Sequence, residues 1–193
     1  MSTSKQSRYH HGDLRGALIA LALETIERSG GEELTLRGLA QRAGVSGMAP
    51  YRHFADKASL LEAVARHGFA ELRDQLRAVD DEEDPTRALI AFGVVYVGFA
   101  CARPGLFRLM YGGTPPTPTD QVVENPETVF DLLTRRIAQL VPPHRRQMTL
   151  LACWSIVHGL ATLLVSGRIR QPTLPPAELA ERLAKMLIEG ILE

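Results

Sequence analysis

Residues 34–57 read LTLRGLAQRAGVSGMAPYRHFADK, and this stretch decides the fold class. Its first part, LRGLAQRA, is expected to form a short amphipathic helix, with Thr35 as N-cap and with Gly44 where the left-handed backbone after a helix favours glycine. A second short helix is expected to begin near Gly47 or the residue after it, because Pro50 is tolerated only in a first helical turn. Two short helices joined by a tight, glycine-containing turn predict a helix-turn-helix.

The sequence on both sides of this stretch is also helical in pattern, and no strand-like alternation is present. The helix before it has its apolar residues on one face and stops at a glycine pair. Prolines and N-cap residues mark the beginnings of later helices. Nine helices are expected in all, at 13–29, 36–43, 47–54, 57–79, 85–102, 104–111, 125–140, 145–169 and 176–192. The predicted fold class is therefore all-α.

Composition restricts the class of protein. Of the 193 residues, 45% are hydrophobic and 23% are charged, which fits a soluble globular protein and excludes disordered, collagen-like and coiled-coil rod classes. The two cysteines form no CxxC pair and are too few for a disulfide scaffold or a zinc module, so a reducing, cytoplasmic setting is expected. Residues 1–13 lack the apolar core of a signal peptide or anchor. Residues 147–167 carry no formal charge, but their recurrent polar side chains favour a buried helix over a membrane span.

Basic residues are concentrated in the helix-turn-helix, although the chain as a whole is neutral, with 22 basic and 22 acidic residues. Within 34–57, four basic residues stand against one acidic residue. A short basic stretch by itself is also consistent with a solvated face, but the turn spacing favours contact with DNA. Small residues at 46–49 allow the second helix to enter a major groove at its N-terminal end, and the polar side chains at 51–53 can bond phosphates.

On this motif the chain resembles the TetR family of transcriptional regulators. The string AGVSGMAPYRHFADKASLLEAV at 43–64 is similar to that family's third helix and the start of its fourth. The string RYHHGDLRGALIALALETIERSGGEELTLRGLA at 8–40 is similar to the family's N-terminus. Further on, WSIVHG at 154–159 resembles the Trp-His-Gly signature of one ligand-domain subgroup.

The resemblance implies a one-component regulator that binds DNA as a homodimer and is released by a ligand. It implies a flexible basic arm at 1–12, a DNA-binding domain at 13–68, and a ligand-binding and dimerisation domain at 69–193. The partners would be double-stranded DNA with a palindromic operator and a small, mostly apolar effector. No cofactor, metal or membrane is expected.

The resemblance also assigns roles within the motif. Arg37 and Met48 correspond to base contacts. Gly47 and Pro50 depart from the bulkier residues that the family often has at these positions, which leaves more of the base readout to arginines and to the N-terminal arm. Phosphate contacts are implied for Thr35, Ser46, Tyr51, His53 and Lys57. The complete set of predicted DNA-binding residues is Lys5, Arg8, Thr35, Arg37, Ser46, Gly47, Met48, Ala49, Tyr51, Arg52, His53 and Lys57.

Small residues recur at helical spacing in the 145–169 helix. Such a stripe permits close approach of another helix, either within the chain or across a two-fold axis. Two half-site readers are needed for tight binding to a palindrome, which favours the dimer, with the last helix completing a four-helix bundle. The predicted interface residues are Ala152, Ser155, Gly159, Thr162, Ser166, Leu179, Leu183, Met186 and Leu187.

Trp154 and His158 lie one turn apart and therefore share a helix face. They are either ordinary core residues or part of an aromatic pocket with few polar anchors. The loop at 112–121 is either a lid over such a pocket or a linker. The predicted pocket residues are Phe92, Tyr96, Phe99, Phe107, Met110, Tyr111, Trp154 and His158.

Catalysis is not expected. Cys153 and His158 are five residues apart on one helix and point to different faces, so they do not form a thiol nucleophile with its base. No paired-carboxylate, metal-ligand or glycine-rich phosphate motif is present. The predicted function is a DNA-binding transcriptional regulator that acts as a ligand-released repressor. The alternative is a helical small-molecule carrier or interaction module without an operator.

Overall fold

The computed structural model describes residues 13–112, 127–169 and 173–192, and it is all-α in these ranges. Two 3-10 turns, Ala49–Arg52 and Pro143–Arg145, accompany the α-helices. Within the described ranges there are eight α-helices, namely α1 (Leu14–Ser29), α2 (Leu36–Arg42), α3 (Lys57–Arg77), α4 (Pro85–Ala102), α5 (Pro104–Gly112), α6 (Val129–Leu140), α7 (Arg146–Val165) and α8 (Pro176–Leu192).

The prediction of nine helices was wrong by one, because the expected third helix is a 3-10 turn over Ala49–Arg52. The amide of Ala49 bonds the carbonyl of Ser46 at 2.9 Å, which is the tighter spacing of a 3-10 turn. Pro50 has no N–H to continue an α-helix, and its ring would collide with the carbonyl four residues earlier. The side chain of Pro50 is buried, so it fixes this turn against the rest of the motif.

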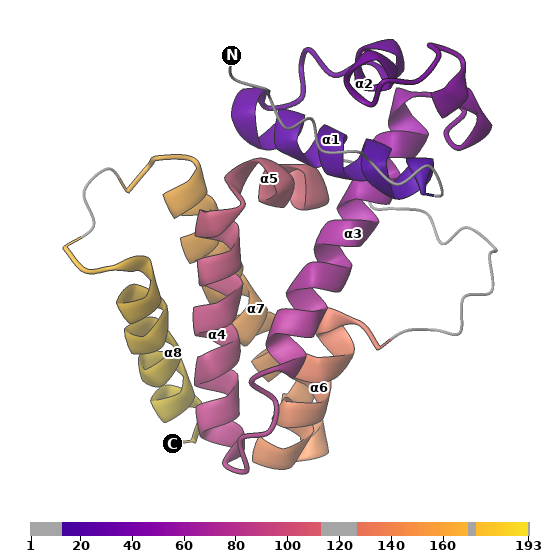
Figure 1. The fold of residues 1–193 in the computed structure, drawn as a ribbon. Coiled ribbons are helices and arrows are strands. Elements are labelled where there is room, and N and C mark those ends of the chain that lie inside the picture. The colour runs from indigo at the N-terminus through magenta and orange to yellow at the C-terminus, as the bar shows by residue number, and fades with distance from the viewer. Residues whose placement is uncertain (1–12, 113–126, 170–172, 193) are drawn as a thin grey trace, which may run out of the picture.

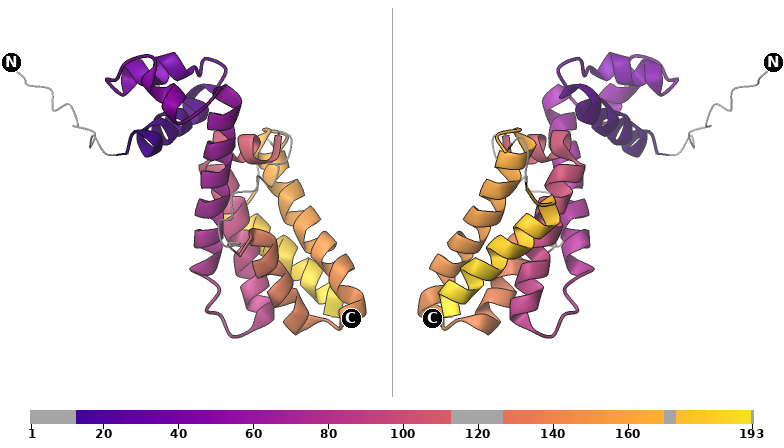
Figure 2. Two further views of the ribbon diagram at one scale, coloured as in Figure 1. Left: turned by 90° about the vertical axis from the view of Figure 1, so that its right-hand side faces the viewer. Right: turned by 90° about the vertical axis from the view of Figure 1, so that its left-hand side faces the viewer.

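The helices form two groups joined by one long helix (Figure 1). α1, α2 and the 3-10 turn lie at one end of the molecule, and α4, α6, α7 and α8 form a bundle at the other. α3 runs from the first group along the side of the bundle, and the views in Figure 2 show the N-terminal group standing clear of α7 and α8. At about 1.5 Å per residue, the 21 residues of α3 span about 30 Å.

α3 begins at a capping box. The carboxylate of Asp56 accepts from the amide of Ser59 at 2.8 Å, and the hydroxyl of Ser59 accepts from the amide of Asp56 at 3.2 Å. These bonds lower the pKa of the Asp56 carboxyl. The helix then continues without interruption through residue 68, where the sequence predicted a domain boundary, so the two groups share a rigid element.

One apolar core joins the two groups. Leu18 of α1, Leu60 and Leu72 of α3 and Leu106 of α5 are each fully buried in the same cluster. At the other end of the bundle, Ile137 belongs to a smaller cluster formed by α4, α6, α7 and α8. α5 therefore packs between α1 and α3 at the junction of the groups.

The contact between α1 and α5 is polar as well as apolar. The carboxylate of Glu27 accepts hydrogen bonds from the amides of Gly105 at 2.9 Å and Leu106 at 3.0 Å, at the positive end of the α5 dipole. A Cβ at Gly105 would lie 2.7 Å from the carbonyl oxygen of Ile26, so only glycine allows this approach. α1 and α5 are thereby held in one relative position.

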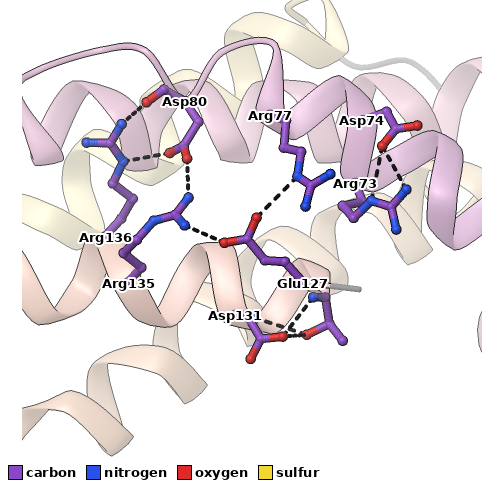
Figure 3. A network of polar contacts seen from close by, with 9 residues as sticks. Arg73, Asp74, Arg77, Asp80, Glu127, Asp131, Arg135 and Arg136 are labelled. Atoms are coloured by element: carbon purple, nitrogen blue, oxygen red, sulfur yellow. Dashed lines mark hydrogen bonds and ion pairs between the residues drawn. The ribbon is translucent and has the colours of Figure 1, made fainter. Parts of the chain in front are cut away.

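A network of ion pairs fastens the end of α3 to α6 (Figure 3). Asp80 follows α3, and its Oδ1 lies 2.7 Å from Nε of the buried Arg136, which also donates to the Asp80 carbonyl. Arg135 bridges Asp80 and Glu127, and Nε of Arg77 lies 3.2 Å from Glu127. These contacts therefore join α6 to the end of α3.

By length and composition alone, α4 and residues Pro143–Val165 reach the thresholds for a membrane-spanning helix. Core helices of soluble proteins satisfy the same test, and α4 is packed on several sides by α6, α7 and α8. On α7, the exposed face alternates apolar residues such as Leu151 with Ser155 and Thr162. This mixed surface suits a protein interface better than hydrocarbon.

Candidate functional site

The helix-turn-helix is held by a buried apolar base. Leu39 and Ala40 of α2 are buried, and Phe54 behind the 3-10 turn is 3% exposed. Gly44 ends α2 with a φ of 70°, a left-handed conformation that suits glycine. The guanidinium of Arg15 lies 5.5 Å from the ring centroid of Phe54 and fixes the turn to α1.

Almost all predicted DNA-contact residues lie on the open side of this base. Met48 is 66% exposed and Tyr51 is 42% exposed, which is unusual for large apolar and aromatic side chains. Ala49 is half-buried, whereas the rest of the described set is exposed. Lys5 and Arg8 lie outside the described residues. The exposed members are Thr35, Arg37, Ser46, Gly47, Met48, Tyr51, Arg52, His53 and Lys57.

The basic residues of the motif differ in their partners. Arg37 and Arg52 make no ion pair or hydrogen bond with any residue in the described ranges. Arg42, by contrast, bonds Glu24 and the hydroxyl of Thr25, each at 2.6 Å, and so braces α2 against α1. Two unpaired guanidinium groups on one surface are available to an external anion such as phosphate.

Thr35 and Lys57 both have structural roles. The role of Thr35 as a helix cap was predicted from the sequence, whereas that of Lys57 was not. The hydroxyl of Thr35 accepts from the amide of Gly38 at 3.0 Å and caps α2. The ammonium of Lys57 donates to the carbonyl of Gly31 at 3.1 Å, in the turn after α1. A contact from Lys57 to phosphate would compete with this bond or share its donors.

A cavity of about 50 Å³ lies inside the bundle at the other end of the molecule. Four of the predicted pocket residues line it, namely Phe92, Tyr96, Tyr111 and Trp154. The other four do not line it: Phe107 and His158 lie in an adjoining ring cluster, Met110 faces Gly68 of α3, and Phe99 is buried in the core. The cavity is smaller than the ~300 Å³ or more of typical small-molecule sites, so a ligand must displace side chains.

His158 is the centre of the ring cluster beside the cavity. Its Nδ1 lies 2.8 Å from the hydroxyl of Tyr96. Its ring centroid is 4.8 Å from that of Tyr111, 5.3 Å from that of Trp154 and 5.7 Å from that of Phe107. The cluster connects α4, α5 and α7, so the position of α5 depends on side chains at the edge of the cavity.

Most of the cavity wall was missed by the sequence prediction. Within α4, helical spacing places other wall residues on the same face as Phe92. The wall residues on α3, α6, α7 and α8 are brought to the cavity by helix packing, which spacing along the sequence does not show. Leu187, which the sequence predicts at a dimer interface, lines the cavity. The missed residues are Leu76, Leu89, Gly93, Val129, Phe130, Leu133, Cys153, Ile156, Val157, Ala184 and Ile188.

The small-residue stripe lies on the outer side of α7. Ser155, Thr162 and Ser166 are exposed, and Ala152 and Gly159 are half-buried. A Cβ at Gly159 would meet no atom within 4 Å, so the described part of the chain has no packing seam there.

Large apolar residues flank this stripe. Met148 on α7 is 69% exposed, and Met186 on α8 is 67% exposed. Leu151 and Leu163 of α7 are also exposed, whereas Leu179 and Leu183 of α8 pack on the core of their own chain. The exposed apolar surface is therefore carried mainly by α7.

Two family models match the chain. The model described as "Bacterial regulatory proteins, tetR family" matches residues 18–64, which contain the helix-turn-helix. The model described as "Tetracyclin repressor-like, C-terminal domain" matches residues 89–187, about half of the chain. The cavity and the stripe lie largely within this second range.

Known proteins are similar over most of this length. A structure of a protein of unknown function from Rhodococcus sp. RHA1 is 33% identical and superposes with a TM-score of 0.82, covering 97% of this chain and 100% of that one. A TetR variant from Acinetobacter baumannii AYE, solved in complex with minocycline, is 25% identical with a TM-score of 0.65, covering 92% and 95% of the two chains. The nucleoid occlusion factor SlmA of Marinomonas sp. (strain MWYL1) is 29% identical over 67% of this chain and 66% of its own length.

The two model matches together cover both groups of helices, and the relatives share the arrangement of the helix-turn-helix and the bundle. Regulators of this kind act by binding and not by catalysis. The chain therefore belongs to the TetR family of bacterial regulatory proteins and is a DNA-binding transcriptional regulator.

Proposed function

We propose that this regulator is a cytoplasmic repressor that binds a palindromic operator as a homodimer and leaves it when a small, mostly apolar effector enters the cavity. The observation that carries the DNA-binding role is the exposure of Arg37 and Arg52, unpaired within the described ranges, at one tip of the molecule. The relative solved in complex with minocycline supports a small-molecule effector.

The proposed division of labour follows the predicted domains, with an arm at 1–12, a DNA-binding part at 13–68 and an effector and dimer part at 69–193. Because Gly47 has no side chain and Pro50 is buried in the 3-10 turn, base contacts are assigned to Arg37, Met48 and Arg52. Ser46, Tyr51 and His53 are proposed to bond phosphates and to set the register.

Replacing Arg52 with alanine tests the DNA-binding surface. Operator affinity is expected to fall about tenfold at moderate salt, because a hydrogen bond to a charged group contributes about 1.5 kcal/mol or more. If Arg52 contacts phosphate, the slope of log affinity against log salt also falls by about 1 and all sequences are affected alike; a base contact lowers affinity for one sequence selectively. Fluorescence anisotropy of labelled duplex measures both quantities.

Arg87→Ala is the charge-matched control. The Arg87 side chain is 74% exposed at the start of α4, at the far end of the molecule from the helix-turn-helix. This variant removes the same charge but should leave both affinity and salt slope unchanged. Equal losses in the two variants would show that net charge, and not the proposed surface, governs binding.

The C-terminal part is proposed to belong to the Trp-His-Gly subgroup that WSIVHG resembles. Trp154 lines the cavity, His158 holds Tyr96 at the edge of it, and Gly159 lies on the outer stripe of α7. The signature would thus combine an effector contact, a link from the cavity to α5 and close helix approach at a dimer interface. α7 of two protomers, with Met186 of α8, is proposed to form that interface.

His158→Ala tests the proposed link between cavity and operator. The change removes the hydrogen bond between His158 and the Tyr96 hydroxyl, and loss of a buried partner costs about 1–3 kcal/mol. The effector concentration that releases operator is expected to rise about tenfold, while the affinity of effector-free protein for operator is unchanged. Circular dichroism melting accompanies the measurement, since a large loss of thermal stability would identify His158 as a core residue only.

Signal transfer is proposed to use two existing connections. α6 lines the cavity through Phe130 and Leu133 and is fastened to the end of α3 by Asp80 and Arg136. α5 carries Tyr111 on the cavity wall and is fastened to α1 through Glu27. Displacement of either wall by an effector would therefore shift the helices that carry the helix-turn-helix.

A further inference from the structure

We infer that the effector of this protein is an uncharged, ring-bearing molecule, and that carboxylates and ammonium compounds of the same size are excluded from the cavity. The inference rests on the proposed function, because it names the chemical class that the proposed effector site takes. It follows from the wall residues in the described ranges, from the rings around His158 and from the ring contact between Phe130 and Trp154 at the cavity.

No wall residue that the structure describes carries a formal charge. The sixteen described residues that line the cavity include no Asp, Glu, Lys or Arg, and their polar side chains are limited to two phenols, one thiol and one indole. Arg136, on the neighbouring helix α6, is already bound to Asp80 and to Gln139. A charged ligand would therefore find no counter-ion among the described wall residues.

The titratable groups in and beside the wall remain neutral near pH 7. Burial raises the pKa values of the Tyr96 and Tyr111 hydroxyls, and it raises the pKa of the Cys153 thiol to about 11. Burial also lowers the pKa of the His158 imidazole, which favours the uncharged ring. None of these groups supplies the charge that the wall lacks.

These properties decide between ligand classes. Transferring an ion from water into such an apolar site is strongly unfavourable when no opposite charge or set of hydrogen bonds compensates it. A neutral ring meets no such penalty and can pack edge-to-face with the rings already present. Isosteric ligands that differ only in charge should therefore differ by about 100-fold or more in affinity.

Phe130 and Trp154 indicate how a ring would be taken up. Their ring centroids are 5.2 Å apart at an interplanar angle of 66°, and Phe130 is 42% exposed on α6. Phe130 can rotate toward solvent without breaking a hydrogen bond, which would open the outer wall and enlarge the cavity of about 50 Å³. A planar ligand would then take the place of the Phe130 ring against Trp154.

The chain offers a built-in reporter for this test. Trp154 is its single tryptophan and lines the cavity, so quenching of its fluorescence reports binding there. The probes are 4-nitrotoluene, 4-nitrobenzoate and 4-nitrobenzylammonium, three nitroaromatic quenchers of similar size with zero, negative and positive charge at pH 7. Titrations use the full-length protein and are corrected for collisional quenching with N-acetyltryptophanamide.

The neutral probe is expected to quench saturably, and each charged probe about 100-fold more weakly or without saturation. Gly93 lies on the cavity wall, and a Cβ at this position would lie 3.3 Å from Val157. The Gly93→Leu side chain should therefore fill the cavity and abolish saturable quenching. Gly98→Leu on the same helix, where a Cβ meets nothing within 4 Å, should leave it intact. If Gly93→Leu does not fold, Phe130→Ala replaces it, because removal of this exposed wall ring should change the affinity without loss of the core.

Tight binding of either charged probe, or no saturable binding of the neutral one, overturns the inference. Measuring operator release with the same three probes distinguishes a failure of the inferred ligand class from a failure of the proposed function. Saturable binding of 4-nitrotoluene without operator release supports the ligand class and contradicts ligand-released repression. Release by 4-nitrobenzoate, with tight binding of that anion, supports ligand-released repression and contradicts the ligand class.

Discussion

Replacing Gly159 with leucine is expected to convert the protein from dimer to monomer and to weaken operator binding by about 100-fold or more. Gly159 lies within the outer stripe of α7, and a Cβ there would meet no atom of the described residues within 4 Å. The larger side chain is therefore tolerated in the protomer but would separate the two α7 helices that the proposed dimer packs together. Loss of the second half-site removes the high effective concentration that a dimer provides, which accounts for the size of the effect.

Sedimentation velocity measures the first effect, and anisotropy with an operator duplex measures the second. Thr134→Leu on α6 is the matched control, because it adds a leucine at an exposed position outside α7 and α8. This control should remain dimeric and bind operator normally. A dimer in the Gly159→Leu variant would place the interface elsewhere on the molecule.

Replacing Arg136 with alanine is expected to lower the free energy of unfolding by about 3 kcal/mol. The Arg136 side chain is 10% exposed and contacts both the carboxylate and the carbonyl of Asp80. Removing one partner of a buried pair leaves the other without compensation, which costs about 3–5 kcal/mol in measured cases. This loss is a large fraction of the ~5–15 kcal/mol that stabilises a typical domain.

The neighbouring arginine provides the control for this experiment. Arg135 contacts the same Asp80 carboxylate, but its side chain is 48% exposed. Exposed ion pairs contribute about 0–1 kcal/mol, so Arg135→Ala should unfold at nearly the same urea concentration as the native protein. Equal destabilisation of the two variants would show that burial of Arg136 does not set the strength of this network.

Local signals in the sequence predicted most of the helices. Thr35, Asp56 and Asp84 cap helices as expected, and Asp84 accepts from the amide of Thr86 at 2.8 Å. These predictions succeeded because a cap and the helix that it begins lie within a few residues of each other. The same local reasoning placed Pro50 in a first helical turn, but the missing N–H and the buried ring produced a 3-10 turn instead.

Features that depend on distant contacts were not predictable from one sequence. Nothing in the sequence pattern connects Asp80 to Arg136, which is 56 residues away along the chain. Helical spacing placed Leu187 on the same face as Leu183, but the packing of α8 decides that Leu187 lines the cavity. The family resemblance predicted the function, but only the structure shows which arginines of the motif are already paired with other residues.

Selection of duplexes from a randomised pool by the purified protein, eluted at rising salt, tests the central claim most directly. The account predicts enrichment of one two-fold symmetric site, retained to higher salt than the bulk of the pool because several phosphate contacts from two protomers act together. Enrichment of an asymmetric site, or no enrichment by folded and dimeric protein, would contradict a dimeric reader of a palindromic operator and would favour the helical carrier.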